Sequence, residues 1–302
     1  MSAPSTKALS GSAFATLLLI ALMMGANHVA ARLAFDHGVT VSTAVLFRSG
    51  MTAVVVWLIV RVAGVPMTVS GAQKTALLKI GLLIGLQSLC LYSAVARLPV
   101  ALALLAFNTY PLWTALWART LKGERIEPRL LRAMPVLLLG LALALDVAGA
   151  ASGLGASAHW GRIGAGVAFA LTAAAAFGLA LVFTQHDTAG LDGRVRTAAT
   201  MALVAACALV GVVGQGGLSL PDAPAGWWGL LGLTALYGTA FTIMFTVLPR
   251  LGVVGGSPIM NVEPIFALVL AWAVLGQSVA AVQVIGGLLV VATVMWLGLR
   301  RR

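Results

Sequence analysis

The chain has 302 residues, of which 61% are hydrophobic and 9% charged, and its formal net charge is +11. A soluble domain carries roughly 25% charged residues, so this composition all but excludes a water-soluble fold of this size. The basic residues do not indicate nucleic-acid binding, because they gather at the ends of apolar segments, where such residues orient a membrane protein.

Ten apolar segments follow one another along the chain, separated by Gly, Pro or charged residues. Each is about 20 residues long, the length of a membrane-spanning helix and twice that of a barrel strand. Since only helices or a closed barrel satisfy every backbone polar group in hydrocarbon, the predicted fold class is an all-α membrane protein. The first segment is too long for a signal peptide and is interpreted as an uncleaved helix. We expect transmembrane helices at 12–35, 41–63, 73–96, 99–121, 132–150, 161–184, 197–215, 226–248, 255–275 and 280–299.

Lys and Arg residues are distributed unevenly between the two sides of such a chain. Fifteen of the 19 fall on the side of both termini, and five of these lie between 119 and 132. Because cytoplasmic loops carry the excess of Lys and Arg, we expect both termini in the cytoplasm, including a tail formed by residues 1–11.

The second half of the chain repeats the first at a fixed offset of 153 residues. Within 96–124 and 249–277 this offset gives seven identical pairs, which include Asn108 with Asn261 and Pro111 with Pro264. The offset also pairs Gly25 with Gly178, a match that chance equally explains in helices so rich in small residues. The two units, 12–150 and 161–299, hold five helices each. Because five is odd, the second unit starts from the opposite side of the membrane and is inverted relative to the first. Inverted repeats are typical of secondary transporters, which bind substrate near the midplane between the repeats.

Four motifs occur in an order that resembles the drug/metabolite transporter superfamily, in its ten-helix EamA-type branch of bacterial inner-membrane exporters. They are LFRSG with Arg48, Tyr-Pro at 110–111, Gly-Glu-Arg at 123–125 and Asn-Val-Glu-Pro at 261–264. The resemblance covers nearly the whole chain and is nearest to the aromatic amino-acid exporters. It implies export of aromatic or apolar amino acids and related amphipathic metabolites across the bacterial inner membrane. One departure is Gly-Gln-Ser at 276–278, where many relatives have Gly-Glu-Arg, so the two repeats need not share a helix-end function.

Polar residues in the middle of a span are costly and tend to face a cavity, so they are the candidates for substrate binding. With the aromatic residues beside them they are Asn27, His28, Gln87, Ser88, Tyr92, Asn108, Tyr110, Trp113, Tyr237, Asn261 and Glu263. Pro111 and Pro264 have no N–H to donate, so each should kink or open its helix. As repeat mates they should meet near the pseudo-two-fold axis, unless the kinks serve packing only.

Several of these residues have more than one interpretation. Tyr110 and Trp113 offer rings for an apolar side chain and an ammonium group, or belong to an interfacial belt. His28 is either an interhelical hydrogen-bonding group or a protonatable cavity residue. Glu263, the only carboxylate near the centre of a span, is a counter-ion, a proton carrier, or a neutral acid that bridges helices. For Arg48 a packing or snorkelling role is preferred to substrate contact.

The sequence therefore predicts a secondary transporter that works by alternating access on an amino acid or amine-like metabolite, and it is compatible with a monomer without fixing the oligomeric state. We expect no metal and no cofactor, because Cys90 and Cys207 lie inside apolar spans and the four His residues show no zinc spacing. The alternative is a polytopic enzyme acting on lipid-linked substrates, but the sequence lacks the paired carboxylates or His/Asp cluster that such an enzyme needs. A passive channel is disfavoured because no ring of charges is visible.

Overall fold

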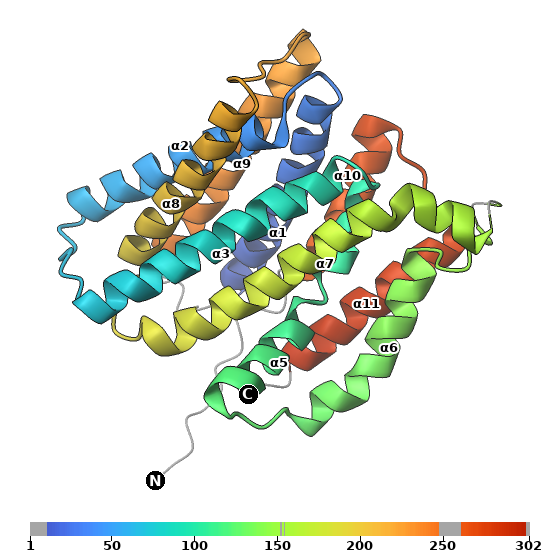
Figure 1. Ribbon diagram of the computed structural model, residues 1–302, viewed down its shortest axis with the longest axis horizontal. Helices are drawn as coiled ribbons and strands as arrows, with labels where there is room; N and C mark the ends of the chain where they lie inside the picture. The colour runs from blue at the N-terminus through green and yellow to red at the C-terminus, as the bar shows by residue number, and fades with distance from the viewer. Residues whose placement is uncertain (1–10, 152, 154, 248–260, 300–302) are drawn as a thin grey trace.

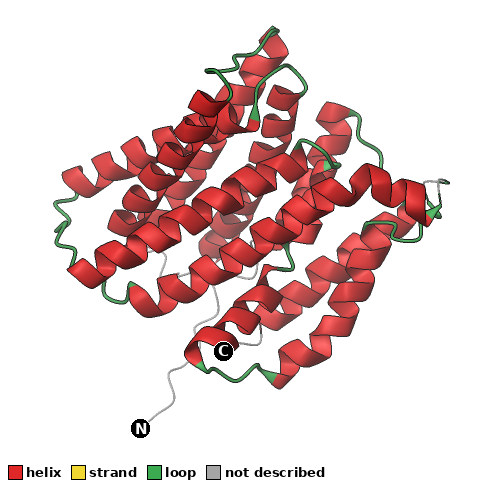
Figure 2. Cartoon of the chain, viewed as in Figure 1, coloured by secondary structure: helices red, strands yellow, loops and turns green. Residues whose placement is uncertain are grey.

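The computed structural model describes residues 11–247 and 261–299, apart from 152 and 154. All regular elements in this part are helices joined by short loops, without any strand (Figure 2), so the predicted all-α fold is confirmed. The helices are α1 (Gly11–Phe35), α2 (Val41–Val62), α3 (Gly71–Val95), α4 (Val100–Phe107), α5 (Tyr110–Lys122), α6 (Pro128–Ala144), α7 (Ala156–Asp187), α8 (Gly193–Gly214), α9 (Pro224–Thr246), α10 (Glu263–Leu275) and α11 (Ala281–Leu299).

These helices form ten membrane spans, because α4 and α5 together make one interrupted span, Val100–Lys122. Seven spans are long and apolar enough to cross a bilayer, and α6, α10 and α11 supply three shorter apolar helices. Large apolar side chains cover the outside of the bundle, as at Val210, Val213 and Trp228, which is 74% exposed. Such an exposed apolar surface suits lipid rather than water.

Helix ends follow from local sequence. Ser70 caps α3 by accepting from the backbone N–H of Gln73, whose side chain accepts in return from the Ser70 N–H. The repeat mates Gly123 and Gly276 end α5 and α10 with φ of 70° and 63°. Glycine has no Cβ to oppose this left-handed conformation, so the same residue type stops the same helix in both repeats.

The predicted helix boundaries are wrong around the loop that joins α6 to α7. The fifth predicted segment, 132–150, corresponds to α6, which ends at Ala144, because Asp146 at φ 50° and Gly149 at φ 66° turn the chain. The apolar composition of 145–151 concealed this turn. As a consequence α7 begins at Ala156, five residues earlier than expected. The predicted tail, except Gly11, and residues 248 and 255–260 of two predicted helices lie outside the described residues.

The helices pack as two inverted repeats, α1–α6 and α7–α11. Figure 1 shows α3 and α7 side by side through the middle, with α2, α8 and α9 on one flank and α6 and α11 on the other. The 153-residue offset relates α2 to α8 and α6 to α11, and each of these pairs packs together. The same offset relates α3 to α9 and α1 to α7. The contact between α3 and α7 therefore has its counterpart in the contact between α9 and α1.

Gly25 and Gly178 show this pseudo-symmetry in atomic detail. A Cβ on Gly25 would lie 3.1 Å from the Ala267 nitrogen of α10, and one on Gly178 would lie 2.8 Å from the Thr114 nitrogen of α5. Ala267 and Thr114 are themselves related by the offset of 153. The glycine match therefore reflects structure: each glycine lets one helix approach the helix that follows a proline motif.

Candidate functional site

The span of α4 and α5 is broken at the Tyr-Pro motif. A continuous helix would bond the N–H of residue 111 to the carbonyl of Phe107, and Pro111 has no N–H to donate. Accordingly α4 ends at Phe107, Asn108 is its C-cap, and α5 restarts at Tyr110. The predicted opening of this helix is confirmed. The Asn108 side chain is buried there, and its Nδ2 has no hydrogen-bond partner.

The second proline motif lies at the start of α10, and residues 248–260 of the predicted helix and loop before it lie outside the described part of the chain. Glu263 is the first residue of α10 and Pro264 lies in its first turn. The Tyr110 hydroxyl donates to Asn261 Oδ1 at 3.4 Å, which joins the start of α5 to the turn before α10. The two proline motifs thus meet, as their relation by the repeat predicts. Both helix N-termini carry partial positive charge into the interior of the protein.

A buried polar network joins α1, α2 and α3 near this meeting point. The Arg48 guanidinium donates from Nη2 to Ser88 Oγ at 2.8 Å and from Nη1 to the Tyr92 hydroxyl at 3.3 Å. The Tyr92 hydroxyl donates in turn to Asn27 Oδ1 at 3.0 Å. The Tyr237 ring of α9 lies 4.0 Å from the Arg48 Cζ, within cation–π distance. This network therefore includes side chains from both repeats.

An acid and an imidazole lie next to this network. Glu263 Oε1 is 3.2 Å from His28 Nε2, and the Glu263 side chain is 25% exposed whereas that of His28 is 7% exposed. The His28 ring is 5.5 Å from the Tyr92 ring, centroid to centroid. Ionisable groups held this close inside a membrane protein are expensive to bury and suit a substrate or ion pathway.

An aromatic cluster surrounds the break between α4 and α5. The Tyr110 ring lies 5.1 Å from Phe177 of α7 in an edge-to-face arrangement, and Phe107 lies 5.5 Å from Phe177. Tyr110 is the repeat mate of Glu263. The two equivalent helix starts therefore differ in chemistry: one sits among aromatic rings and the other bears a carboxylate.

Gln87 and Trp113 lie at the margins of these clusters, whereas Ser88 and Tyr92 lie within the polar network. Gln87 reaches the network only through Ser88, whose hydroxyl donates to its Oε1 at 3.4 Å. Trp113 packs where α5 crosses α7, with its Cβ close to Gly178. Ser88 and Tyr92 are fully buried against neighbouring side chains and line no open space in this conformation.

Sequence reasoning undervalued Arg48 and missed Phe107 and Phe177. Arg48 does not snorkel, since it is only 3% exposed and its guanidinium points into the protein. The charge of Arg48 inside an apolar segment was the feature of the sequence that could have identified it as a site residue. The two phenylalanines gave none, because an apolar ring in an apolar helix stands out only when its neighbours are known. In the described part of the chain, no three His, Cys, Asp or Glu side chains group closely enough to hold a metal ion.

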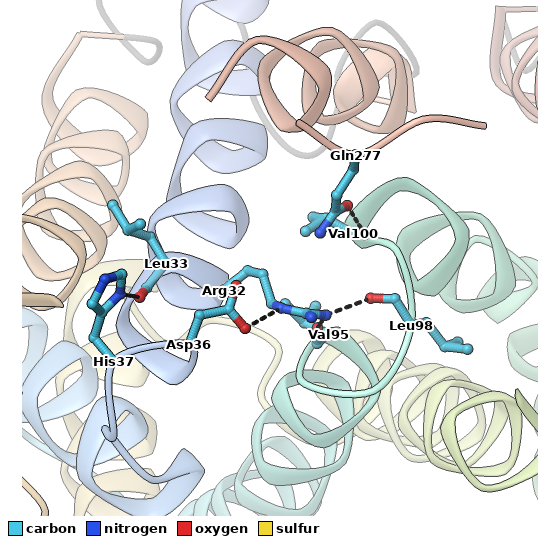
Figure 3. Close-up of polar contacts among 8 residues, drawn as sticks. All are labelled: Arg32, Leu33, Asp36, His37, Val95, Leu98, Val100 and Gln277. Atoms are coloured by element: carbon cyan, nitrogen blue, oxygen red, sulfur yellow. Dashed lines mark hydrogen bonds and ion pairs between the residues drawn. The ribbon is translucent and has the colours of Figure 1, made fainter. Parts of the chain in front are cut away.

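Polar contacts close the far end of the bundle, where α1 ends and α2 begins. Figure 3 shows the Arg32 guanidinium, which donates from Nε to Asp36 and from Nη1 to the carbonyls of Val95 and Leu98. In the same view Gln277, from the loop after α10, accepts from the Val100 N–H at 3.1 Å. These bonds join α1, the α3–α4 turn and the second repeat.

Two further contacts join the repeats at the near end, where α5 and α7 end. Lys122 Nζ lies 2.7 Å from Asp187 Oδ1, and His186 Nε2 lies 2.7 Å from Glu124 Oε1. Glu124 and Gln277 are repeat mates but contact different helices at opposite ends of the bundle. The two copies of this motif therefore make different contacts in this chain.

Comparisons with known proteins agree with this architecture. The model of the EamA-like transporter family matches the chain twice, at residues 11–145 and 164–299. No match was found among curated proteins. One solved structure, described only as the crystal structure of a protein, covers 96% of this chain and 98% of its own, with a TM-score of 0.59 and 20% identity. This likeness shows a shared fold.

Proposed function

Since the chain belongs to the EamA-like transporter family of membrane proteins, we propose that it exports aromatic or apolar amino acids, and related amphipathic metabolites, across the bacterial inner membrane. The observation that carries this proposal is the meeting of the two proline motifs, where Tyr110 contacts Asn261 two residues before Glu263. Broken helices that meet between inverted repeats form the substrate sites of many secondary transporters.

The chemistry around this point supports an amphipathic substrate. The rings of Phe107, Tyr110 and Phe177 offer aromatic surface to an apolar side chain. Glu263 offers a carboxylate to an ammonium group, in competition with His28. Membership of a transporter family favours transport over catalysis, and both repeats lie in one chain, so the transporter is proposed to work as a monomer.

Contacts at the two ends of the bundle suit alternating access. Arg32 and Gln277 connect elements at the far end, and the pairs Lys122–Asp187 and Glu124–His186 connect α5 to α7 at the near end. A transporter that exposes its site to one side at a time must break the contacts at one end while keeping those at the other. With both termini in the cytoplasm, the far end is the periplasmic one.

Counterflow into proteoliposomes tests the proposed function. Vesicles that contain the purified chain and are loaded with unlabelled phenylalanine should accumulate external labelled phenylalanine in a saturable manner, and empty vesicles should not. Leucine and tryptophan should compete, whereas aspartate should not. If no amino acid of such a panel drives counterflow, the proposed substrate class is wrong.

A further inference from the structure

Arg48 is a buried cation whose partners are all neutral. It is 3% exposed, and its hydrogen bonds go to the hydroxyls of Ser88 and Tyr92. Within the described residues no ion pair includes Arg48. An unpaired charge is among the most expensive groups to hold inside a membrane protein, so its presence calls for an anion at some step of function.

We propose that Arg48 is the residue that recognises the carboxylate of the substrate. The inference rests on the proposed function and extends it: the transporter selects molecules that carry a carboxylate, rather than amines in general. Bidentate recognition of carboxylates is the chemistry to which the guanidinium group is best suited.

The neighbours of Arg48 leave one N–H donor, at the edge of the planar guanidinium, for a substrate carboxylate. The Tyr92 and Tyr237 rings lie 4.6 and 4.0 Å from the guanidinium carbon and cover the group by cation–π contact. The N–H donors of a guanidinium lie in its plane, and the hydrogen bonds to Tyr92 and Ser88 use Nη1 and Nη2 but not Nε. The Nε of Arg48 is buried and has no hydrogen-bond partner among the residues that the structure describes.

Asn27 adds a second donor to the same place. Its Oδ1 accepts from the Tyr92 hydroxyl, which also accepts from Arg48, so the amide and the guanidinium share one partner. The Asn27 Nδ2 is buried and, within residues 11–247 and 261–299, has no hydrogen-bond partner either. Each of these two side chains thus has a buried N–H donor without an acceptor among the described residues, and leaving both unmet is costly. A carboxylate supplies the acceptors that both need.

A group of opposite charge also lies near Tyr92. The Tyr92 ring is 4.6 Å from the Arg48 guanidinium carbon and 5.5 Å from the His28 ring, and His28 pairs with Glu263. A cationic group and an acidic group therefore both lie near Tyr92, and a zwitterionic substrate carries one group complementary to each. In the described conformation Tyr92 and Tyr237 cover Arg48, so contact with the carboxylate belongs to another step of the transport cycle.

A pure packing role for Arg48 explains less. The arginine ties α2 to α3 and α9, but a neutral glutamine could donate to the same two hydroxyls without the cost of a buried charge. The packing role and the recognition role differ in one measurable respect: only recognition makes the effect of substitution depend on whether the ligand carries a carboxylate.

Titration calorimetry on the purified full chain in detergent tests the inference with three ligands: phenylalanine, 3-phenylpropionate and phenethylamine. In Arg48→Gln the Kd for the two carboxylates should rise about tenfold to a hundredfold, the magnitude of a lost charge-assisted hydrogen bond. The Kd for phenethylamine should change less than about twofold, and Arg48→Lys should retain part of the carboxylate binding. Ser49→Ala is the matched control, because Ser49 is the next residue of α2, is fully buried and has no partner for its hydroxyl.

The inference is overturned if Arg48→Gln weakens all three ligands equally or leaves all three unchanged. Should the variant not fold, the wild type decides: it must bind 3-phenylpropionate at least about tenfold more tightly than the neutral 3-phenylpropanamide, and equal affinities overturn the inference. Arg48-dependent carboxylate binding without phenylalanine counterflow would refute the proposed function alone. Counterflow with no dependence of carboxylate binding on Arg48 would refute the inference alone.

Discussion

Substitution of Glu263 by glutamine isolates the contribution of one charge to substrate binding. Glutamine preserves the shape of the side chain and can still accept a hydrogen bond from His28, which lies 3.2 Å from Glu263 Oε1. We therefore expect Glu263→Gln to fold and to insert normally. What the variant loses is the negative charge that the substrate ammonium is proposed to contact.

The expected size of the effect follows from the kind of hydrogen bond that is lost. A hydrogen bond to a charged group contributes roughly 1.5–3 kcal/mol and a neutral one roughly 0.5–1.5 kcal/mol, so the exchange removes about 1–1.5 kcal/mol. The Kd for phenylalanine should rise about fivefold to tenfold. Glu263→Ala, which removes both charge and acceptor, should weaken binding more, about tenfold to a hundredfold. A side chain that is 25% exposed is partly screened by solvent, which favours the lower ends of these ranges.

Calorimetry and counterflow, repeated between about pH 5 and pH 8, measure the affinity and its dependence on protonation. Asp192→Asn is the control, because Asp192 is an acid outside the site that pairs with Arg194 at the start of α8. Binding of 3-phenylpropionate, which has no ammonium group, should not respond to Glu263→Gln. If the variant binds and transports phenylalanine like the wild type, with the same pH dependence, Glu263 is a structural acid and the reasoning is refuted.

Three further outcomes are expected. Tyr110→Ala should weaken phenylalanine binding about fivefold to thirtyfold by removing the ring that contacts Phe177, whereas Tyr110→Phe should cost little; equal losses would place the role in the hydroxyl. Gly178→Ala should destabilise the protein by about 1–3 kcal/mol in thermal unfolding, because its Cβ would lie 2.8 Å from the Thr114 nitrogen, while Gly161→Ala in the same helix meets open space and should be tolerated; similar Tm values for both variants would contradict the packing described. A cysteine that replaces Asp222 should react with an impermeant reagent in intact spheroplasts and one that replaces Arg302 should not; the reverse would invert the proposed topology.

Much of the candidate site was predictable because bilayers penalise polar groups, which leaves few of them in a span. His28, Tyr92 and Glu263 were identified on this ground, and the structure brings them into contact. The pairing of Pro111 with Pro264 predicted the broken helix and the contact between the two motifs. The end of α6 was not predicted, since Asp146 is the only charged residue in 145–151 and the rest of this stretch is small or apolar like the span before it.

The sequence by itself determined the fold class, the ten spans and the inverted repeat, because hydrophobic length, proline positions and a fixed offset are properties of the chain alone. Tertiary structure decided which mid-span groups are partners. Arg48 could have snorkelled to one surface, and only the packing of α2 against α3 and α9 shows its guanidinium between two tyrosines with no anion beside it. Partners separated by 40 to 65 positions along the chain, as Ser88 is from Arg48 and Tyr92 from Asn27, are chosen by helix packing, which no local pattern records.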